Sequence, residues 1–279
     1  MNILLTNDDG IAAPGLWAAA RALAGLGSVL VAAPARNYSG YGAALPPVKS
    51  IPYFPYTRAE GHPRGVTAFG LEAPPASCVQ AGLSGALSGA KIDLVVSGIN
   101  DAANLGRDVL YSGTVGAAMT AHVLGVPAVA VSLAAAPASQ AHHWETAAWA
   151  IGEVVAMWLA YEGVQGAAPL LFNVNVPNLP RDEVAGVFVT CLLSRDSCLT
   201  KYAFITRTDD GAGSVMSVIP RNSPRPASPE LWSDAWAVAS SYVSVTPLRL
   251  FADELHASPA APVGETVRAL PVFTAVANG

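Results

Sequence analysis

Two adjacent carboxylates, Asp8 and Asp9, stand where an apolar run near the start of the chain ends at a glycine. The run, Ile3–Thr6, has the length and composition of a short buried strand. Neighbouring side chains of an extended chain point to opposite sides. Both carboxylates can therefore face one cation only if the strand breaks here, and Gly10 allows the backbone to turn. An ordinary turn uses the same residue types, so these residues alone leave both readings open.

Oxygen-bearing side chains also follow two later predicted strands. Ser39 comes after the strand Val29–Ala33, and Asn100 comes after the strand Ile92–Val96. In open α/β sheets ligands bind beyond the carboxyl ends of the strands, so these side chains are expected near the paired carboxylates. Carboxylate, hydroxyl and amide oxygens form a hard ligand set that suits Mg²⁺, Mn²⁺ or Ca²⁺.

A second group of small polar residues precedes the predicted helix Val115–Leu124. Ser112, Gly113 and Thr114 lie where free backbone N–H groups and the helix dipole attract an anion. An ordinary helix N-cap would use the same residues. A cation cluster and an anion-binding helix terminus at one sheet edge together favour a phosphoryl group as the ligand.

The first half of the chain alternates predicted strands and helices, which indicates a doubly wound, mainly parallel α/β sheet of Rossmann-like type. The expected strands are Ile3–Thr6, Val29–Ala33, Ile92–Val96, Ala128–Leu133 and Leu170–Val174. The expected helices are Gly15–Leu26, Ala76–Leu87, Val115–Leu124 and Ala141–Tyr161. We therefore expect residues 1–180 to form the catalytic core.

After residue 180 the pattern changes to short apolar strands and a proline-dense loop, which predicts a C-terminal β-hairpin arm within residues 181–279. The expected strands are Val187–Leu193, Phe204–Thr208 and Val215–Ile219. A lone two-stranded hairpin is marginally stable in water, and pairing with another subunit would bury its edge. We expect a homodimer or homotetramer assembled through this arm, with the rest of the segment returning to the core.

Composition argues against several partners and locations. The net charge is −5 and only 13% of residues are charged, so the chain lacks a basic stripe that could neutralise a nucleic-acid backbone. The sequence has neither a signal-peptide pattern nor an apolar stretch long enough to span a membrane. Three cysteines without CxxC spacing indicate reduced thiols. We expect a cytoplasmic protein that binds neither membranes nor nucleic-acid polymers.

Motifs of other classes are missing. The first strand is not followed by GxGxxG, and neither GxxxxGK[ST] nor GxSxG occurs, which argues against dinucleotide, P-loop and serine-hydrolase sites. A receiver domain also has paired acids after its first strand, but Lys49, Lys91 and Lys201 are misplaced for its lysine. A phosphate-ligand binding protein without catalytic activity would use the same residues and stays as an alternative.

The chain resembles the SurE family of metal-dependent 5′/3′-nucleotidases over about residues 1–250. The segments that carry the resemblance, in order and spacing, are Ile3–Gly10, Ser97–Asn100, Asn104–Ala118, Asn173–Pro177 and Tyr242–Leu248. The resemblance implies a Rossmann-like core and a hairpin arm exchanged between subunits. It also implies hydrolysis of a small phosphorylated substrate at one divalent cation per subunit, Mg²⁺ or Mn²⁺, in a site that Ca²⁺ could also occupy.

Carried over by position, the resemblance implies a set of site residues. The metal ligands would be Asp8, Asp9, Ser39 and Asn100. The residues around the phosphate and substrate would be Asn100, Asn104, Ser112, Gly113, Thr114, Ser39 and Tyr41. The catalytic residues would be Asp8, Asp9, Asn100 and Ser112. The sequence leaves open whether Asp9 attacks phosphorus or only binds the cation.

This chain departs from the family pattern in several loops. Relative to the usual family pattern, Ala35 replaces a carboxylate and Ala102 replaces a glycine. A tyrosine is introduced at position 41, and Thr120-Ala121 replaces Glu-Gly. None of these is a proposed metal ligand, so we expect a divalent-metal-dependent phosphatase of nucleoside monophosphates or a related small phosphomonoester. Tyr38 and Tyr41 could offer aromatic faces, which predicts selection of a bulkier or less polar leaving group. Neutral variation in surface loops is the competing interpretation.

Overall fold

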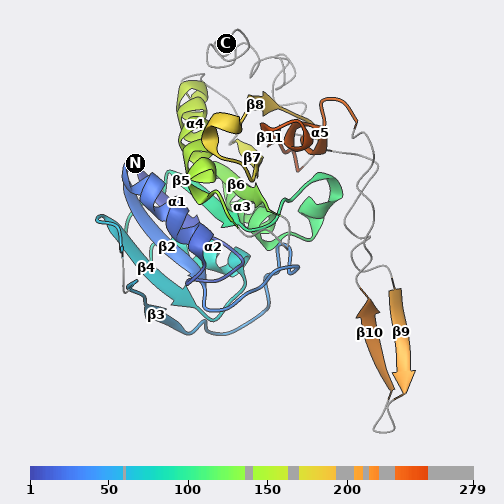
Figure 1. The fold of residues 1–279 in the computed structure, drawn as a ribbon. Helices are drawn as coiled ribbons and strands as arrows, with labels where there is room; N and C mark the ends of the chain where they lie inside the picture. Colours follow the sequence, from blue (N-terminus) through green and yellow to red (C-terminus); the bar gives the residue numbers. More distant parts are fainter. Residues whose placement is uncertain are drawn as a thin grey trace.

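The computed structural model describes residues 1–58, 61–135, 141–162, 170–192, 204–209, 214–219 and 230–250. Within these ranges the main sheet has nine strands in the order β3-β4-β2-β1-β5-β6-β7-β11-β8 (Figure 1). Six neighbouring strands in its middle are parallel. They are β4 (Val66–Leu71), β2 (Ser28–Pro34), β1 (Asn2–Thr6), β5 (Leu94–Asn100), β6 (Ala128–Ala134) and β7 (Leu171–Pro177). The predicted α/β fold with a mainly parallel sheet is confirmed.

The order of the strands places a topological switch point at β1. From β1 the chain builds β2 and β4 on one side, and it then returns to the other side of β1 for β5, β6 and β7. In doubly wound sheets ligands bind beyond the carboxyl ends of the strands at such a reversal. The segments after β1 and β5 are therefore the expected location of a site.

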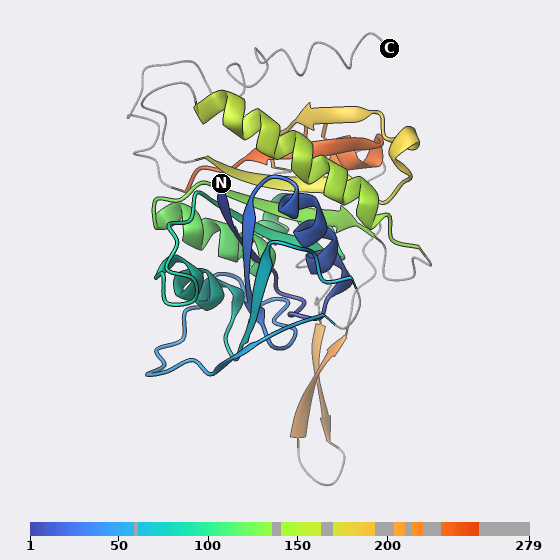
Figure 2. The ribbon, with the colours of Figure 1, turned by 90° about the vertical axis from the view of Figure 1, so that its left-hand side faces the viewer.

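Helices cover both faces of the sheet (Figure 2). On one face, α1 (Pro14–Ala24) and α4 (Trp144–Glu162) pack in the same core as Ile3 and Leu5 of β1. On the other face, α2 (Pro75–Leu83) and α3 (Gly113–Val123) pack in the same core as Leu4. Successive residues of a strand point to opposite faces of the sheet. Because helices cover both faces here, the central strands have continuous apolar sequences.

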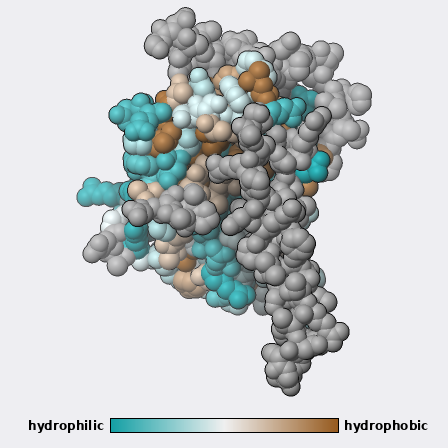
Figure 3. Space-filling model, turned by 45° about the vertical axis from the view of Figure 1, so that its right-hand side comes forward, coloured by the Kyte–Doolittle hydropathy of each residue, from teal (hydrophilic) through white to brown (hydrophobic). Residues whose placement is uncertain are grey.

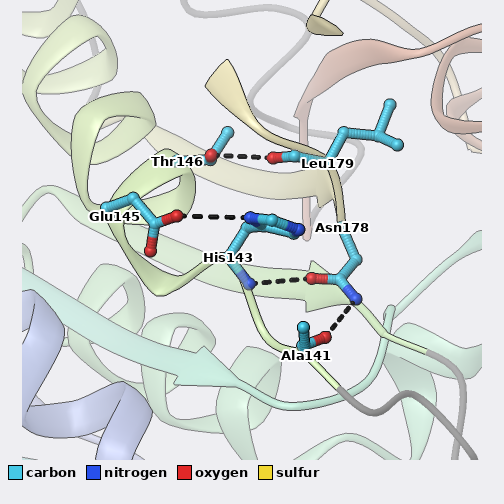
Figure 4. Close-up of polar contacts among 6 residues, drawn as sticks. All are labelled: Ala141, His143, Glu145, Thr146, Asn178 and Leu179. Carbon is cyan, nitrogen blue, oxygen red and sulfur yellow. Dashed lines mark hydrogen bonds and ion pairs between the residues drawn. The ribbon is translucent and has the colours of Figure 1, made fainter. Parts of the chain in front are cut away.

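Polar contacts fasten the start of α4 to the segment after β7 (Figure 4). The His143 N–H donates to Asn178 Oδ1 at 2.9 Å, and Asn178 Nδ2 donates to the carbonyl of Ala141 at 2.9 Å. The Thr146 hydroxyl donates to the carbonyl of Leu179 at 2.8 Å. These contacts hold the long helix against the sheet.

The C-terminal part of the chain extends the main sheet. β11 (Tyr242–Pro247) pairs antiparallel with β7 and parallel with β8 (Gly186–Val189), and the short helix α5 (Asp234–Ala239) contacts β11. β9 (Phe204–Asp209) and β10 (Ser214–Ile219) pair only with each other within the described residues, and they project away from the main sheet (Figures 1 and 2). The predicted hairpin therefore corresponds to β9 and β10.

Some boundaries differ from the predictions. The expected strand Val187–Leu193 is shorter and belongs to the main sheet, because its backbone pairs with β11, and Val187 and Val189 pack against the core. The second expected helix ends at Leu83, before Gly85, whose φ is +79°. The structure also contains elements that the sequence patterns do not predict. These are β4, β11, α5, the edge strand β3 (Tyr53–Pro55) and the 3-10 helices η1 (Gly106–Leu110) and η2 (Arg181–Glu183).

In the part of the chain that the structure describes, none of the helices combines the length and the apolar character that crossing a membrane requires.

Candidate functional site

Asp8 lies just beyond β1, buried against the start of α3. The Thr114 hydroxyl donates to Asp8 Oδ1 at 2.5 Å, and Asp8 is 3% exposed. A Cβ added to Gly113 would lie 2.7 Å from the Asp8 Cβ, so a larger residue there would displace the carboxylate. Burial raises the pKa of Asp8, while hydrogen bonds from Thr114 and Gly113 act in the opposite direction. The start of α3 thus contacts the Asp8 carboxylate itself.

Asp9 lies beside two other acids. Burial raises the pKa of Asp9 to about 7, and the negative charges of Asp8 and Asp101 add to the effect. Hydrogen bonds from the Asp101 backbone and from Asn37 Nδ2, 3.2 Å from Asp9 Oδ1, favour the ionised form. The site therefore concentrates negative charge that its own hydrogen bonds only partly offset.

Short backbone contacts bring the ends of β1 and β2 together. The backbone turns at Gly10, whose φ is +104°, and Asn7 Nδ2 donates to the Gly10 carbonyl at 3.0 Å. The Tyr38 N–H donates to the Asp8 carbonyl at 2.7 Å. The chain therefore breaks from extended geometry at the predicted glycine, and the loop after β2 lies against the paired acids.

Ser39 and Asn100 reach the same edge from β2 and β5. The Ser39 N–H donates to Asn37 Oδ1 at 2.8 Å, so Asn37 connects Ser39 to Asp9. Asn100 Nδ2 donates to the carbonyl of Ala102 at 2.6 Å, which fixes the orientation of its amide. Asn37 and Asp101 were not among the predicted site residues. Asn two positions before Ser39 is an Asx-turn signal that could have identified the first of them.

Ser112 and Asn104 are both held by hydrogen bonds. Ser112 is the N-cap of α3, where its Oγ accepts from the Val115 N–H at 3.1 Å and its own hydroxyl hydrogen can donate elsewhere. Asn104 is buried, and its Nδ2 donates to Ser132 Oγ at 2.8 Å. The interpretation of Ser112 as an N-cap thus holds, and it is compatible with a contact to an anion.

Tyr41 lies on an exposed loop joined to the segment before α3. It is 57% exposed, and its ring meets that of Tyr38 edge-on with centroids 5.0 Å apart. The next residue, Gly42, donates its N–H to the carbonyl of Tyr111 at 3.0 Å. Leu110 and Tyr111 are exposed as well, so an apolar rim formed by Tyr41, Leu110 and Tyr111 borders this edge. Hydrophobic residues also reach the surface at several places on the face drawn in Figure 3.

A metal at this edge would need neutral oxygen ligands. Across the described ranges, no three or more His, Cys, Asp or Glu side chains converge in a group that could hold a metal. Asp8 and Asp9 would therefore act together with hydroxyl or amide oxygens, a combination that suits hard cations.

Known proteins resemble this chain over almost its whole length. Residues 3–198 match the family model described as Survival protein SurE. The chain is 41% identical over 251 residues to the 5′/3′-nucleotidase SurE of Cronobacter sakazakii, covering 90% of each protein. It is 40% identical over 253 residues to the 5′-nucleotidase SurE of Methylococcus capsulatus, covering 90% of this chain and 92% of that protein. The crystal structure of the SurE protein from Aquifex aeolicus matches with a TM-score of 0.69 and 32% identity, covering 96% and 98% of the two chains.

Proposed function

The chain belongs to the SurE family and is a phosphoric monoester hydrolase, and we propose that it releases phosphate from nucleoside monophosphates or a related, more specialised phosphomonoester. The observation that carries the proposal is the pair of carboxylates beyond β1, of which Asp8 lies against the start of α3 and Asp9 lies beside Asp8. Relatives between 37% and 41% identical are named as 5′- or 5′/3′-nucleotidases.

The donor set supports a divalent cation, Mg²⁺ or Mn²⁺, in each subunit. Asp8 and Asp9 are partly or fully buried like charges, an arrangement that a bound cation stabilises. Ser39 and Asn100 would supply the neutral oxygens. When bound, the cation supplies a Lewis acid for a phosphoryl oxygen and lowers the pKa of a bound water.

The chain's own residues would orient the phosphoryl group. Ser112 would donate its hydroxyl hydrogen to an equatorial oxygen, since its Oγ already accepts from α3. Thr114 would act through Asp8, because its hydroxyl donates to that carboxylate. Gly113 allows the start of α3 to approach the reacting group closely. Asp9 would either orient the attacking water or attack phosphorus itself.

A panel of phosphomonoesters tests this function. Phosphate release is measured from p-nitrophenyl phosphate and from 5′- and 3′-nucleotides, with Mn²⁺ and with a chelator. We expect release that depends on the metal. A phosphate-ligand binding protein of the same fold is the second candidate, because the same residues would bind a phosphate group; nucleotide binding without release under all conditions would favour it.

Tyr41 is expected to select the leaving group. Tyr41→Ala should lower kcat/KM about tenfold for the preferred nucleotide, because stacking on a base is worth about 1–3 kcal/mol. A small aliphatic phosphomonoester should be hydrolysed equally by both forms. The matched control is Tyr53→Ala, another exposed tyrosine, on the edge strand β3. Efficient, unselective hydrolysis of AMP, GMP, CMP and UMP that Tyr41→Ala leaves unchanged would contradict this role.

We further propose that β9 and β10 form an arm through which subunits assemble as a homodimer or homotetramer. An isolated two-stranded sheet is marginally stable, so its edges favour pairing with another chain. Light scattering at micromolar concentration should give a mass above that of one chain. Replacing residues 204–219 by a short Gly-Ser loop should lower that mass. A compact monomer of the unaltered protein would rule the arm out as an assembly element.

A cytoplasmic location is also part of the proposal. Cys78 and Cys191 are free thiols, and burial raises the pKa of both. Cys198 lies outside the described residues. Unpaired thiols are typical of a reducing compartment.

A further inference from the structure

Buried asparagines of β7 form hydrogen bonds with the first residue of the segment from Asn104 to Ser112. Asn175 pairs with the backbone of Asn104: its Oδ1 accepts from the Asn104 N–H at 2.8 Å, and its Nδ2 donates to the Asn104 carbonyl at 3.1 Å. Asn173 Nδ2 donates to the same carbonyl at 2.8 Å. Both β7 asparagines are fully buried. The first part of the segment is thus attached to the main sheet by three hydrogen bonds.

A second attachment comes from a distant part of the chain. Asp234, in α5, is fully buried, and its Oδ2 accepts from the Gly106 N–H at 2.7 Å across 128 positions of sequence. Its Oδ1 accepts from the Ala235 N–H at 2.8 Å, and its own N–H donates to the carbonyl of Cys191 at 2.8 Å. Hydrogen bonds to a charged acceptor are stronger than neutral ones, and a buried carboxylate needs them. The Asp234 carboxylate therefore holds the backbone N–H of Gly106 in place.

Gly106 is directly connected to the phosphate side of the site. It is the first residue of η1, which ends at Leu110, two positions before Ser112. The Ser112 N–H donates to the carbonyl of Asp108 in the same 3-10 helix at 3.1 Å. A displacement at Gly106 would therefore move Ser112 and the start of α3. Asp8 contacts the start of α3 through Thr114, but Asp8 and Asp9 are also held by β1 and by the loop after β2, which do not depend on Gly106.

We propose that Asp234 is a positioning residue for phosphate binding, acting through the Gly106 N–H to fix η1 and Ser112. The inference rests on the proposed phosphatase function. It makes α5, which lies beyond the hairpin in the sequence, part of the support of a site built mainly from the first half of the chain. The effect on Asp8 and Asp9 should be smaller, because the Tyr38 N–H and Asn37 hold these two residues from the loop after β2.

The test compares Asp234→Ala and Asp234→Asn with the unaltered protein. Calorimetry with inorganic phosphate in the presence of Mn²⁺ measures phosphate affinity. Hydrolysis of p-nitrophenyl phosphate gives kcat and KM. The shift in Tm on adding Mn²⁺ reports metal binding at Asp8 and Asp9. We expect Asp234→Ala to weaken phosphate binding about tenfold or more, because a small misplacement of Ser112 is enough for an effect of that size. The Mn²⁺ shift should be retained. Asn can accept at only one of the two N–H groups, so Asp234→Asn should be intermediate.

Ser233→Ala is the matched control. Ser233 caps the same helix through its Oγ, which accepts from the Trp236 N–H at 3.1 Å, but it leaves the Asp234 side chain in place. It should lower the Tm without changing phosphate affinity or kcat/KM. If Ser233→Ala weakens phosphate binding as much as Asp234→Ala does, or if Asp234→Ala abolishes the Mn²⁺ shift as well, α5 acts only through general stability and the proposal fails.

The remaining outcomes are also decisive. Should Asp234→Ala not fold, the near-isosteric Asp234→Asn decides, and unchanged phosphate affinity in it overturns the proposal. If the unaltered protein binds phosphate and releases it from substrates while neither variant changes either property, the positioning role alone is wrong. If the unaltered protein shows neither property, the proposed function fails first.

Discussion

Asp8→Asn and Asp9→Asn are each expected to abolish metal-dependent phosphate release while leaving the fold intact. Both side chains lie beyond β1, where their negative charge would bind a cation. Asparagine removes this charge but keeps the shape of the side chain, so the fold should be unaffected. Loss of an outer-shell partner of a metal already costs about 10–100-fold, so losing a ligand should lower kcat/KM by roughly 100-fold or more. Phosphate release at saturating Mn²⁺ measures the effect.

The Tm separates a loss of metal binding from a loss of structure. Mn²⁺ should raise the Tm of the unaltered protein and much less that of either variant. With a chelator, Asp9→Asn should be at least as stable as the unaltered protein, because it removes a buried negative charge that Asp8 and Asp101 repel. Asp93→Asn is the control, since Asp93 is an exposed acid just before β5, at the opposite end of the strands. Near-normal activity of either site variant at saturating metal would show that its carboxylate is wrongly assigned.

Gly113→Ala is expected to damage the site as severely as removal of a carboxylate. The added Cβ would lie 2.7 Å from the Asp8 Cβ and 2.8 Å from its Oδ2, closer than real Cβ contacts allow. Either α3 or Asp8 must move, and the bond from Thr114 to Asp8 would be lost. We expect kcat/KM to fall by roughly 100-fold, because small misplacements at a reacting centre have effects of that size. Steady-state kinetics and the Mn²⁺-induced Tm shift measure it.

Gly152→Ala is the matched control for this substitution. Gly152 lies inside α4, and a Cβ there would meet nothing within 4 Å. Alanine in a helix interior is favoured over glycine by about 0.5–1 kcal/mol, so this variant should be slightly more stable and fully active. Full activity of Gly113→Ala would mean that the start of α3 does not approach the reacting group.

The fold class and the edge of the sheet at which the candidate site residues gather could be predicted from sequence patterns. Alternating strand and helix patterns predict parallel strands, and the carboxyl ends of parallel strands meet at one edge. Asp8, Asp9, Ser39 and Asn100 could therefore be grouped from their positions after the strands alone. Gly10 could be predicted as part of the turn after β1 because its neighbours are turn residues, and its φ of +104° agrees.

The side chains and backbone groups that support these residues could not be predicted, because they come from distant parts of the chain. Thr114 contacts Asp8 across 106 positions, Asn175 contacts Asn104 across 71, and Asp234 contacts Gly106 across 128. The tertiary structure also decided that β8 and β11 complete the main sheet, while β9 and β10 leave it. The physical reason is that periodic patterns report which face of a local element is buried, whereas the partner of a buried polar group depends on which elements pack together.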